Sequence, residues 1–377
     1  MNTIFTVGIF LSLFLAALLF VKKNKTMADN ILGIWMVVIG IELASYYIYF
    51  LGYWDKYPHL VGITSPFPLL FGPLLYLYVD FSLRKKQYFR PKDWLHFIPF
   101  VITYLAMTPF LFGYSAEQKR LADSLDFNSE FKSFFIFGFT MFFITAVVYP
   151  IFAYRKITNY QKYISDNFAY KESISLKWLK ILIWGAAAVF LSVIAIFLLQ
   201  EGLKIDFGFK GDIIPDILVV IFVAVLGFFG IRQQGIFTDV VVSQKEMDDS
   251  MQEKESYKRS GLKSSDAEIL HQRLLDLMDN EKPYLEPKLS LSQLAEKLTI
   301  TPNNLSQIIN QCDEKNFYDF VNGYRVQEFI SLATSPQNKN MNLLGIALDA
   351  GFNSKSSFNQ VFKKTTGKTP REYLSAN

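Results

Sequence analysis

The chain has 377 residues, enough for two or three domains. Apolar residues make up 51% of it, Phe alone contributes 37, and the mean hydropathy is +0.21, which excludes an ordinary water-soluble enzyme. The apolar excess is local, since all 5 Trp and 30 of the 37 Phe precede residue 234. Lys and Arg outnumber Asp and Glu by 21 to 15 over residues 1–233, but the counts are 5 to 6 over 234–265 and 12 to 13 over 266–377. The composition therefore predicts a membrane half followed by a soluble half.

The sequence offers little material for a metal or catalytic centre. Cys312 is the only cysteine, which excludes an internal disulfide and a thiol pair for a metal. The three histidines, His59, His96 and His271, are far apart in the sequence, whereas metal sites usually draw on several His or Cys ligands. We therefore expect no metal, no cofactor and no catalytic residues, and we predict that the protein is not an enzyme.

Seven apolar stretches in the first half each approach the roughly 20 residues that a helix needs to cross a bilayer. Their length and their lack of alternation favour helices over strands, because a helix satisfies its own backbone hydrogen bonds in lipid. The predicted spans are 4–21, 31–51, 63–83, 94–112, 131–154, 178–199 and 213–231. We interpret residues 1–233 as a seven-helix transmembrane sensor domain.

The basic residues predict how these spans are oriented. No basic residue precedes the first stretch, and Lys22, Lys23 and Lys25 follow it, the charge order of a retained helix with its N-terminus outside. Loops one, three and five carry 13 Lys and Arg, against 5 in loops two, four and six, which places the odd loops inside. We predict a multi-pass protein of the cell (inner) membrane, with an outside N-terminus and a cytoplasmic C-terminal domain.

Two features within the predicted spans are candidates for sensing a ligand. Glu42 lies mid-span near Tyr46, and a carboxyl group at that depth should face the bundle interior, protonated or paired. Pro66 and Pro73 bend the third span, which can shape a cavity between helices. A purely structural role stays open for both features: a hydrogen bond to a neighbouring Tyr or Ser, and a packing kink. Two other acidic residues lie near span ends, where we expect them to be solvated: Asp80 and Asp216.

A polar segment, residues 234–265, separates the two halves. Its apolar positions Val240, Met247 and Met251 lie seven and four residues apart, which can form a thin helical seam for dimerisation. A solvated linker is the alternative interpretation. In either case we expect residues 232–265 to transmit the signal.

From residue 266 the pattern is that of water-soluble helices. Leu291, Leu294, Ala295 and Leu298 form an apolar stripe, and a short turn leads to a second helix. Thr301 caps that helix and a proline suits its first position. With Leu305, Ile308 and Ile309 pointing inward, the outward residues are Asn303, Ser306, Gln307 and Asn310. This spacing predicts a helix-turn-helix.

The arrangement recurs once along the chain. Asn342 caps a helix that runs to Ala350, Gly351 supplies the turn, and Ser354 starts a second exposed helix that runs to Thr366. Between the two units we expect a helix from residue 316 to about 332, roughly 26 Å long. Two outward helices held apart by one rigid helix can enter neighbouring major grooves, which lie about 34 Å apart.

Residues 346–373 read IALDAGFNSKSSFNQVFKKTTGKTPREY. This stretch resembles the signature of the AraC/XylS family of bacterial transcription regulators, and the resemblance covers about residues 266–377. It implies a DNA-binding domain of two helix-turn-helix units, each of which inserts its second helix into the major groove. In the best-known members the sensor is a soluble sugar-binding barrel. Here seven predicted membrane helices replace it, so the layout resembles that of membrane-embedded AraC-type regulators.

The resemblance also implies which residues face DNA. In the first unit Asn303, Ser306 and Gln307 would face bases, with Asn310 on the same outward surface. In the second unit the resemblance implies base-facing Lys355, Ser356, Ser357 and Gln360, with Lys363 and Lys364 near phosphates. Many members carry Arg where this chain has Gln360. Because Arg suits guanine whereas Gln suits adenine, the base preference of the family is not carried over.

The charge of the C-terminal half gives a mixed indication. Residues 266–377 carry 12 basic and 13 acidic side chains, a net charge of −1, so there is no general basic footprint. Residues 355–377 carry five basic side chains against Glu372 alone, a local +4 that suffices for a few phosphate contacts. The residues alone leave a helical protein-interaction domain as an equal alternative, and the resemblance favours DNA binding.

Together these observations predict an all-α protein with a seven-helix bundle (1–233), a polar linker (234–265) and a cytosolic domain of two helix-turn-helix units joined by a linker helix (266–377). The expected function is that of a membrane-embedded, sequence-specific transcription regulator that couples a sensed signal to promoter binding. The expected partners are promoter DNA, the lipid bilayer, a second copy of the chain, a small-molecule or membrane signal, and RNA polymerase. The alternative is a membrane transporter or enzyme with a regulatory helical tail, although no coupling-ion motif or internal repeat is visible.

Overall fold

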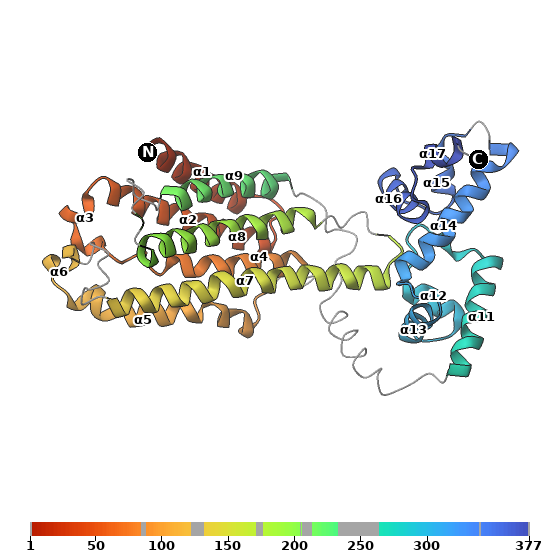
Figure 1. Ribbon diagram of the computed structural model, residues 1–377, viewed down its shortest axis with the longest axis horizontal. Coiled ribbons are helices and arrows are strands. Elements are labelled where there is room, and N and C mark those ends of the chain that lie inside the picture. Colours follow the sequence, from red (N-terminus) through yellow and green to blue (C-terminus); the bar gives the residue numbers. More distant parts are fainter. Residues whose placement is uncertain are drawn as a thin grey trace. The chain divides into compact units, whose positions relative to one another are not determined.

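The computed structural model describes residues 2–83, 88–121, 132–170, 176–203, 205, 213–232, 264–338 and 341–375. Over these ranges the protein is helical, with one isolated β-bridge and no strand (Figure 1). The predicted all-α class is confirmed. Most of the polar linker, residues 234–263, lies outside the described residues, and so does the predicted dimerisation seam.

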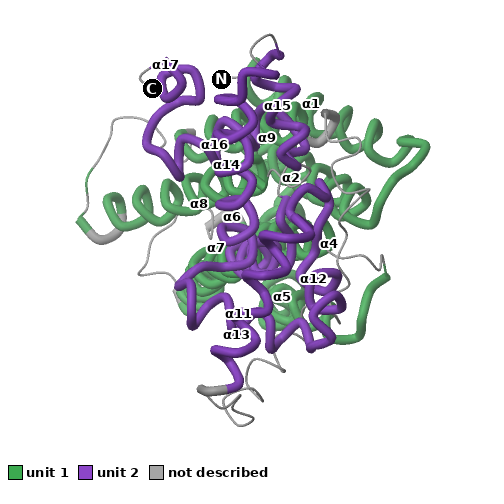
Figure 2. The backbone as a smooth tube through the Cα atoms, turned by 90° about the vertical axis from the view of Figure 1, so that its right-hand side faces the viewer, with its two compact units in different colours: residues 1–157, 176–235 green, residues 158–175, 236–377 purple. Residues whose placement is uncertain are grey.

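The chain forms two compact units (Figure 2). The first unit comprises residues 1–157 and 176–235, and the second comprises 158–175 and 236–377. The second unit thus includes a segment that the sequence places in the membrane half. The predicted domain boundaries stay predictions.

The described part of the first unit consists mainly of apolar helices. Five helical stretches are long and apolar enough to cross a membrane: Thr3–Val21, Met27–Phe50, Pro91–Gly113, Ile136–Asn167 and Lys177–Gln200. Two shorter apolar stretches, Phe67–Leu83 and Ile214–Phe229, coincide with the third and seventh predicted spans. The elements are α1 (Asn2–Val21), α2 (Met27–Phe50), α3 (Tyr53–Lys56), η1 (Pro58–Leu60), η2 (Phe67–Leu70), α4 (Phe71–Leu83), η3 (Pro91–Phe97), α5 (Ile98–Gly113), α6 (Ala116–Leu121), α7 (Lys132–Asn167), α8 (Lys177–Phe197), η4 (Leu198–Gly202) and α9 (Ile213–Arg232).

Small residues let α1 pack closely against α2 and α9. A Cβ atom added to Gly40 of α2 would lie 2.8 Å from the Ser12 hydroxyl of α1. A Cβ atom added to Gly227 of α9 would lie 2.5 Å from Leu15 of α1. Close backbone approach through glycine is typical of helix contacts in membranes, so these positions explain why α1 contacts both neighbours.

Helix α7 is longer than the sequence predicts. The predicted span ends at residue 154, but the helix continues to Asn167. In the added turns Ile157, Tyr160 and Ile164 are buried, and their spacing of three and four residues is that of one helix face. This stripe was a readable signal for a longer helix, although the basic and polar residues around it favour a loop.

The second unit holds two apolar cores that share one helix. Its C-terminal elements are α11 (Ser264–Asn280), η5 (Pro283–Leu285), α12 (Leu291–Leu298), α13 (Pro302–Cys312), α14 (Phe317–Thr334), η6 (Pro336–Asn338), α15 (Leu343–Asp349), α16 (Lys355–Thr366) and α17 (Pro370–Ser375). The first core joins α11, α12 and α13 to Phe320 and Val321 of α14. The second core joins α15 and α16 to Val326 and Phe329 of the same helix. Helix α14 therefore connects the pair α12–α13 to the pair α15–α16.

Candidate nucleic-acid interface

Local signals of the sequence build the first helix pair, α12–α13. Ser290 and Gln293 form a capping box, in which each side chain accepts the backbone N–H of the other. Thr299 adopts a left-handed conformation with φ of 59°, which turns the chain after α12. Thr301 then caps α13, and Pro302 takes its first position.

Helix α13 turns one face inward and the other outward. Leu305, Ile308 and Ile309 are fully buried. The four residues predicted on the outward face are partly or fully exposed: Asn303, Ser306, Gln307 and Asn310. The Asn310 amide donates to the Ser306 carbonyl at 2.6 Å, which holds one of these side chains against its own helix. Base reading by this face stays a prediction.

The second helix pair, α15–α16, repeats the same construction. Asn342 caps α15 by accepting the Gly345 N–H at 2.6 Å. Ser354 caps α16 by accepting the Ser357 N–H at 3.4 Å. The turn between the helices depends on Gly351, whose φ is +90°. A Cβ atom there would lie 2.4 Å from a backbone carbonyl oxygen of η5, so this position accepts only glycine without a shift of the chain.

Helix α16 likewise separates a buried and an exposed face. Phe358, Val361 and Phe362 are buried in the second core. The predicted DNA-facing residues that are fully exposed are Lys355, Ser356, Gln360, Lys363 and Lys364, and Ser357 is partly exposed. All six are accessible to a ligand, and their contacts to DNA stay predictions.

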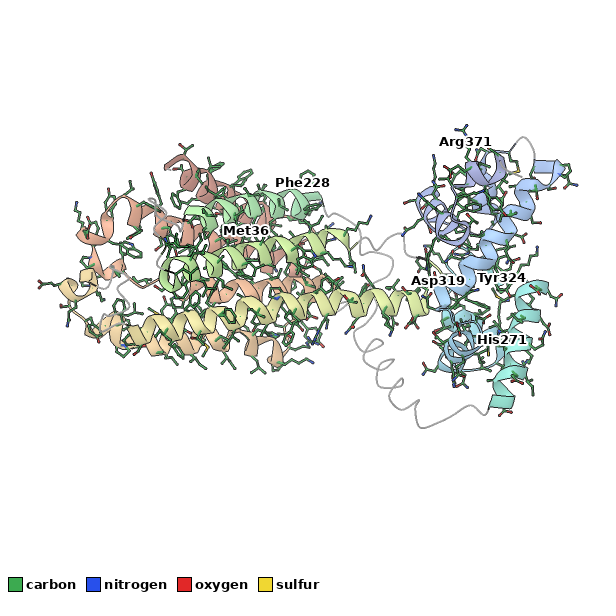
Figure 3. All side chains as sticks on the ribbon, viewed as in Figure 1. Met36, Phe228, His271, Asp319, Tyr324 and Arg371 are labelled. Carbon is green, nitrogen blue, oxygen red and sulfur yellow. The ribbon has the colours of Figure 1, made fainter. Side chains whose placement is uncertain are left out.

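One predicted phosphate contact already has an acidic partner. The Lys364 ammonium lies 2.6 Å from the Asp319 carboxylate, in the first turn of α14 (Figure 3). Lys364 remains 65% exposed. Among the described residues Lys363 forms no such ion pair. We therefore expect Lys363 to contribute a fuller charge to phosphate binding than Lys364.

Helix α14 carries a buried cation that sequence reasoning missed. Arg325 is only 1% exposed, although arginine is almost never fully buried without partners. Its Nε donates to the Tyr284 carbonyl and its Nη2 to the Glu286 carbonyl, each at 2.7 Å. Its Nη1 donates to the Ala169 carbonyl at 3.0 Å and to the Asn322 amide oxygen at 3.2 Å. The only sequence signal was a basic residue between two core positions of an apolar helix.

An ionic contact fastens η5 to α14 beside this arginine. The Glu328 carboxylate accepts from the Tyr284 hydroxyl at 3.0 Å and lies 2.9 Å from the Lys282 ammonium. Burial, followed by the hydrogen bond to Glu328, raises the pKa of Tyr284. Tyr284 therefore remains a neutral donor, and its ring stacks on that of Tyr324 at 5.5 Å between centroids.

Within the described residues no group of three or more His, Cys, Asp or Glu side chains could hold a metal ion. Cys312 is exposed at the end of α13. Partial desolvation and the nearby carboxylates of Asp313 and Glu268 raise the pKa of its thiol. The Asp313 carboxylate also contacts the His271 ring at 3.0 Å, an isolated pair that joins α13 to α11.

In the first unit, the four candidate sensing residues come from three elements. Glu42 is buried on α2, and Tyr46, one turn later, is partly exposed. Pro66 is buried just before η2, and Pro73 is buried in the first turn of α4. Helix α2 contacts both η2 and α4. The elements that carry these residues therefore touch one another, although a ligand role stays a prediction.

Glu42 belongs to a polar cluster inside the apolar bundle. Its carboxyl lies beside Thr64 and close enough to Asp216 of α9 for an electrostatic interaction. The Thr64 hydroxyl donates to the Ser45 hydroxyl at 2.8 Å. The buried Oε2 atom of Glu42 has no hydrogen-bond partner among the described residues. A carboxyl group buried in this way is costly unless it is protonated or paired, and its exchange of a proton or contact with a ligand stays a prediction.

The expectation that Asp80 and Asp216 are solvated is wrong. Asp80 is fully buried and Asp216 is 7% exposed. Asp80 pairs with the Lys156 ammonium at 2.9 Å and with the Arg90 guanidinium at 3.4 Å. Proximity to a predicted span end did not reveal these partners, because they come from α7 and from the segment before η3.

Residues 294–376, which run from α12 to the end of α17, match a family model described as a helix-turn-helix domain. No curated protein and no solved structure matches the chain. The matched residues are under a quarter of the chain. They include most of α12, all of α13 to α17 and the whole stretch that resembles the AraC/XylS signature. The match supports an AraC-type DNA-binding domain over these residues, and hence a DNA-binding transcription regulator.

Proposed function

We propose that this protein is a membrane-embedded transcription regulator, in which an N-terminal bundle of seven helices senses a signal and a cytosolic C-terminal domain binds a promoter. The proposal depends on one observation: the same chain contains five helices long and apolar enough to cross a membrane and, at residues 294–376, a match to a helix-turn-helix domain. A regulator anchored in this way needs no enzymatic activity of its own.

The exposed faces of α13 and α16 supply the DNA-reading groups of this proposal. Amides and hydroxyls on α13 would hydrogen-bond base edges, and Gln360 of α16 would bind adenine through its N6 and N7 atoms. Lys363 and Lys364 close α16 near the phosphates, where neutralised charges make binding salt-dependent. The residues assigned to DNA contact are Asn303, Ser306, Gln307, Asn310, Lys355, Ser356, Ser357, Gln360, Lys363 and Lys364.

The surface of the first unit supports the membrane assignment. Large apolar side chains face outward on several helices: Phe10 is 68% exposed, Leu105 67%, Phe112 83% and Leu191 63%. Apolar exposure on this scale would favour aggregation in water but suits contact with lipid. The two shorter apolar stretches would then complete seven crossings, and the excess of basic residues in the odd loops would orient them with the C-terminal domain in the cytoplasm.

The polar cluster around Glu42 is the proposed sensing site. It lies among elements that contain Pro66 and Pro73, and its carboxyl groups are costly to bury in an apolar bundle unless they are protonated or paired. A small molecule or a change in the membrane that favours one arrangement of these elements would shift the protein between two states. A structural role for Glu42 remains the alternative.

Pairing of two chains in the membrane completes the proposed mechanism. One domain with few phosphate contacts binds modestly at cellular salt. Two copies held side by side bind adjacent sites with a raised effective concentration, without any new contact. The bundle would then regulate transcription by changing how two cytosolic domains are presented to DNA and to RNA polymerase.

The test is selection of DNA from a random library by the purified full-length protein in detergent. We expect an enriched sequence, and we expect Gln360→Ala to weaken binding at one base position by about 1–3 kcal/mol, the size of a bidentate contact. The matched control is Gln327→Ala, which removes an exposed glutamine from α14 and should leave the selected sequence unchanged. No enrichment at all would exclude sequence-specific binding.

A membrane transporter or enzyme with a regulatory tail is the second candidate, favoured by the buried carboxyls of Glu42 and Asp216. The selection experiment separates the two candidates. A transporter with a merely regulatory tail would enrich no DNA sequence. Substrate-dependent flux in proteoliposomes would then be the expected activity.

A further inference from the structure

The segment that follows α7 is docked on the C-terminal helices of the second unit. The Ala169 N–H donates to the Leu289 carbonyl at 3.1 Å. Phe168 and Ser290 form an isolated antiparallel bridge. Because the hydrogen bond runs from Ala169 to Leu289 and not between Phe168 and Ser290, these two residues form a non-hydrogen-bonded pair, with side chains closer than in a hydrogen-bonded pair.

Two side chains of α14 capture the other backbone group of the docked residue. The Ala169 carbonyl accepts from the Asn322 amide at 2.9 Å and from Arg325 Nη1 at 3.0 Å. Asn322 and Arg325 are each 1% exposed. The Ala169 side chain is itself buried and packs in the first core. The segment before α12 and helix α14 thus satisfy both backbone polar groups of one residue, as in strand addition to a peptide-binding site.

Arg325 links this docked residue to both helix pairs. It holds the Tyr284 and Glu286 carbonyls of the segment that precedes α12. On another side it lies against Gly351, where an added Cβ atom would be 3.1 Å from its Nε. Gly351 forms the turn between α15 and α16. If the segment left its docking surface, the buried donors of Asn322 and Arg325 would lose the Ala169 carbonyl as their acceptor. Because a buried donor without a partner is costly, the surroundings of Arg325 would have to rearrange.

Helix α7 connects this docked segment directly to the first unit. The helix is continuous to Asn167, and a single residue, Phe168, separates its end from Ala169. Eleven residues before its end, Lys156 pairs with the buried Asp80 carboxylate. A displacement of α7 is therefore passed to the docked segment through a helix, with almost no intervening loop to absorb it.

We propose that residues 168–170 are a coupling contact, which docks on the Leu289 backbone, Asn322 and Arg325 and so ties the movement of α7 to the geometry of the two helix pairs. The proposal rests on the proposed function, since it takes the helix pairs to bind DNA. It gives the signal a route through α7 that does not require residues 234–263. The occupant of the docking surface is this chain's own segment.

Disulfide trapping in the full-length protein tests the docking itself. Non-hydrogen-bonded antiparallel partners have Cα atoms about 4.5 Å apart, within the range that a disulfide spans. The variant is Phe168→Cys with Ser290→Cys in a Cys312→Ser background, which removes the only native thiol. We expect a rapid intramolecular cross-link in isolated membranes. The matched control, Lys162→Cys with Ser290→Cys, starts from an exposed residue of α7 and should not cross-link.

A second substitution removes the docked state without altering the docking surface. Ala169→Asp places a carboxylate in the apolar core and against a captured carbonyl, so it should abolish the cross-link between positions 168 and 290. Lys162→Asp introduces the same side chain at an exposed position and should leave the cross-link intact. The docking would be overturned if the double variant alone failed to cross-link. It would also be overturned if the cross-link still formed after Ala169→Asp was added.

Coupling to DNA is tested by the equilibrium constant for forming the disulfide between positions 168 and 290 in a glutathione buffer, with and without the DNA fragment selected above. Equilibrium coupling between two sites is reciprocal, so bound DNA should change this constant by about fivefold or more, the lower end of typical allosteric effects. An unchanged constant when the fragment is bound would overturn the coupling and leave a purely structural contact. If the unsubstituted protein selects no DNA sequence while the 168–290 double variant still cross-links, the proposed function is contradicted and the docking is not.

Discussion

The two units of the protein distribute polar and apolar side chains in opposite ways. In the first unit Phe112 is 83% exposed while Asp80 is fully buried. In the second unit the core consists of residues such as Leu294 and Phe358, and Lys364 stays 65% exposed. Water favours the second distribution and lipid favours the first. An apolar side chain is therefore a good indicator of burial in the second unit but not in the first, where large apolar side chains are exposed and a carboxylate is buried.

Among its described residues the second unit also buries two polar side chains, those of Asn322 and Arg325. Arg325 is buried among backbone carbonyls, as Asp80 of the first unit is buried among cations. Each of these groups is held by partners from segments that are distant in sequence. If these contacts stabilise the two units, removing a buried charge or altering a tight turn should destabilise the unit that contains it.

The largest effect is expected from Arg325→Met. The substitution keeps much of the volume but leaves several buried carbonyls without their donor, and each such loss costs about 1–3 kcal/mol. We expect the second unit to lose about 4 kcal/mol of stability, a sum of several such losses. Urea unfolding followed by hydrogen exchange of α14 measures this loss. Arg371→Met at an exposed position (Figure 3) should change stability by less than about 0.5 kcal/mol. Equal effects of the two substitutions would contradict the structural role of Arg325.

Gly351→Ala is expected to cost about 3 kcal/mol, because it combines a left-handed backbone with a clash. The new Cβ atom would meet the Tyr284 carbonyl oxygen at 2.4 Å. Gly367 provides a matched control, since its φ is +76° but nothing lies within 4 Å of an added Cβ atom. Gly367→Ala should cost only about 1 kcal/mol, for the backbone conformation alone. The same unfolding measurement compares the two, and a larger cost at Gly367 would refute the account.

Asp80→Asn tests a buried charge of the first unit. It removes the anion from two ion pairs. Lys156, whose side chain is 19% exposed, then has no anionic partner at this position. Breaking a buried pair is destabilising, and we expect a loss of about 2 kcal/mol because Arg90 keeps its contact with Asp93. Thermal unfolding in detergent measures the loss. Asp55→Asn at an exposed site is the control, and a similar shift there would show that the burial of Asp80 is not decisive.

The smallest effect concerns two adjacent lysines of the second unit. Lys363→Ala should weaken binding to all DNA sequences alike and flatten the dependence of log affinity on log salt by about one unit. Lys364→Ala should flatten it less, because the Asp319 carboxylate at 2.6 Å already offsets part of that charge. Salt titrations of the full-length protein on the selected fragment compare the slopes. A larger change for Lys364 would show that its ion pair opens on DNA.

The helices of the second unit were predicted to within a few residues. The cap residues Thr301, Asn342 and Ser354 each accept a backbone N–H as expected, because a cap acts over three residues and needs no distant partner. The exposed face of α13 followed from local periodicity, and the residues expected on the exposed face of α16 followed from the resemblance to the AraC/XylS signature. In the first unit, length and composition located the apolar helices but did not predict the extension of α7 or the burial of Asp80 in two ion pairs.

What the sequence by itself determined is therefore local: the helices, their caps, the outward polar faces and the family signature. Only the tertiary structure decided which polar groups are buried and what holds them. Asn322 and Arg325 meet Ala169 across 153 and 156 residues of chain, and Asp80 meets Lys156 from another helix. Periodicity describes how a helix faces its surroundings over a few residues. It carries no information about which distant backbone carbonyl will be brought within 3 Å of a buried donor.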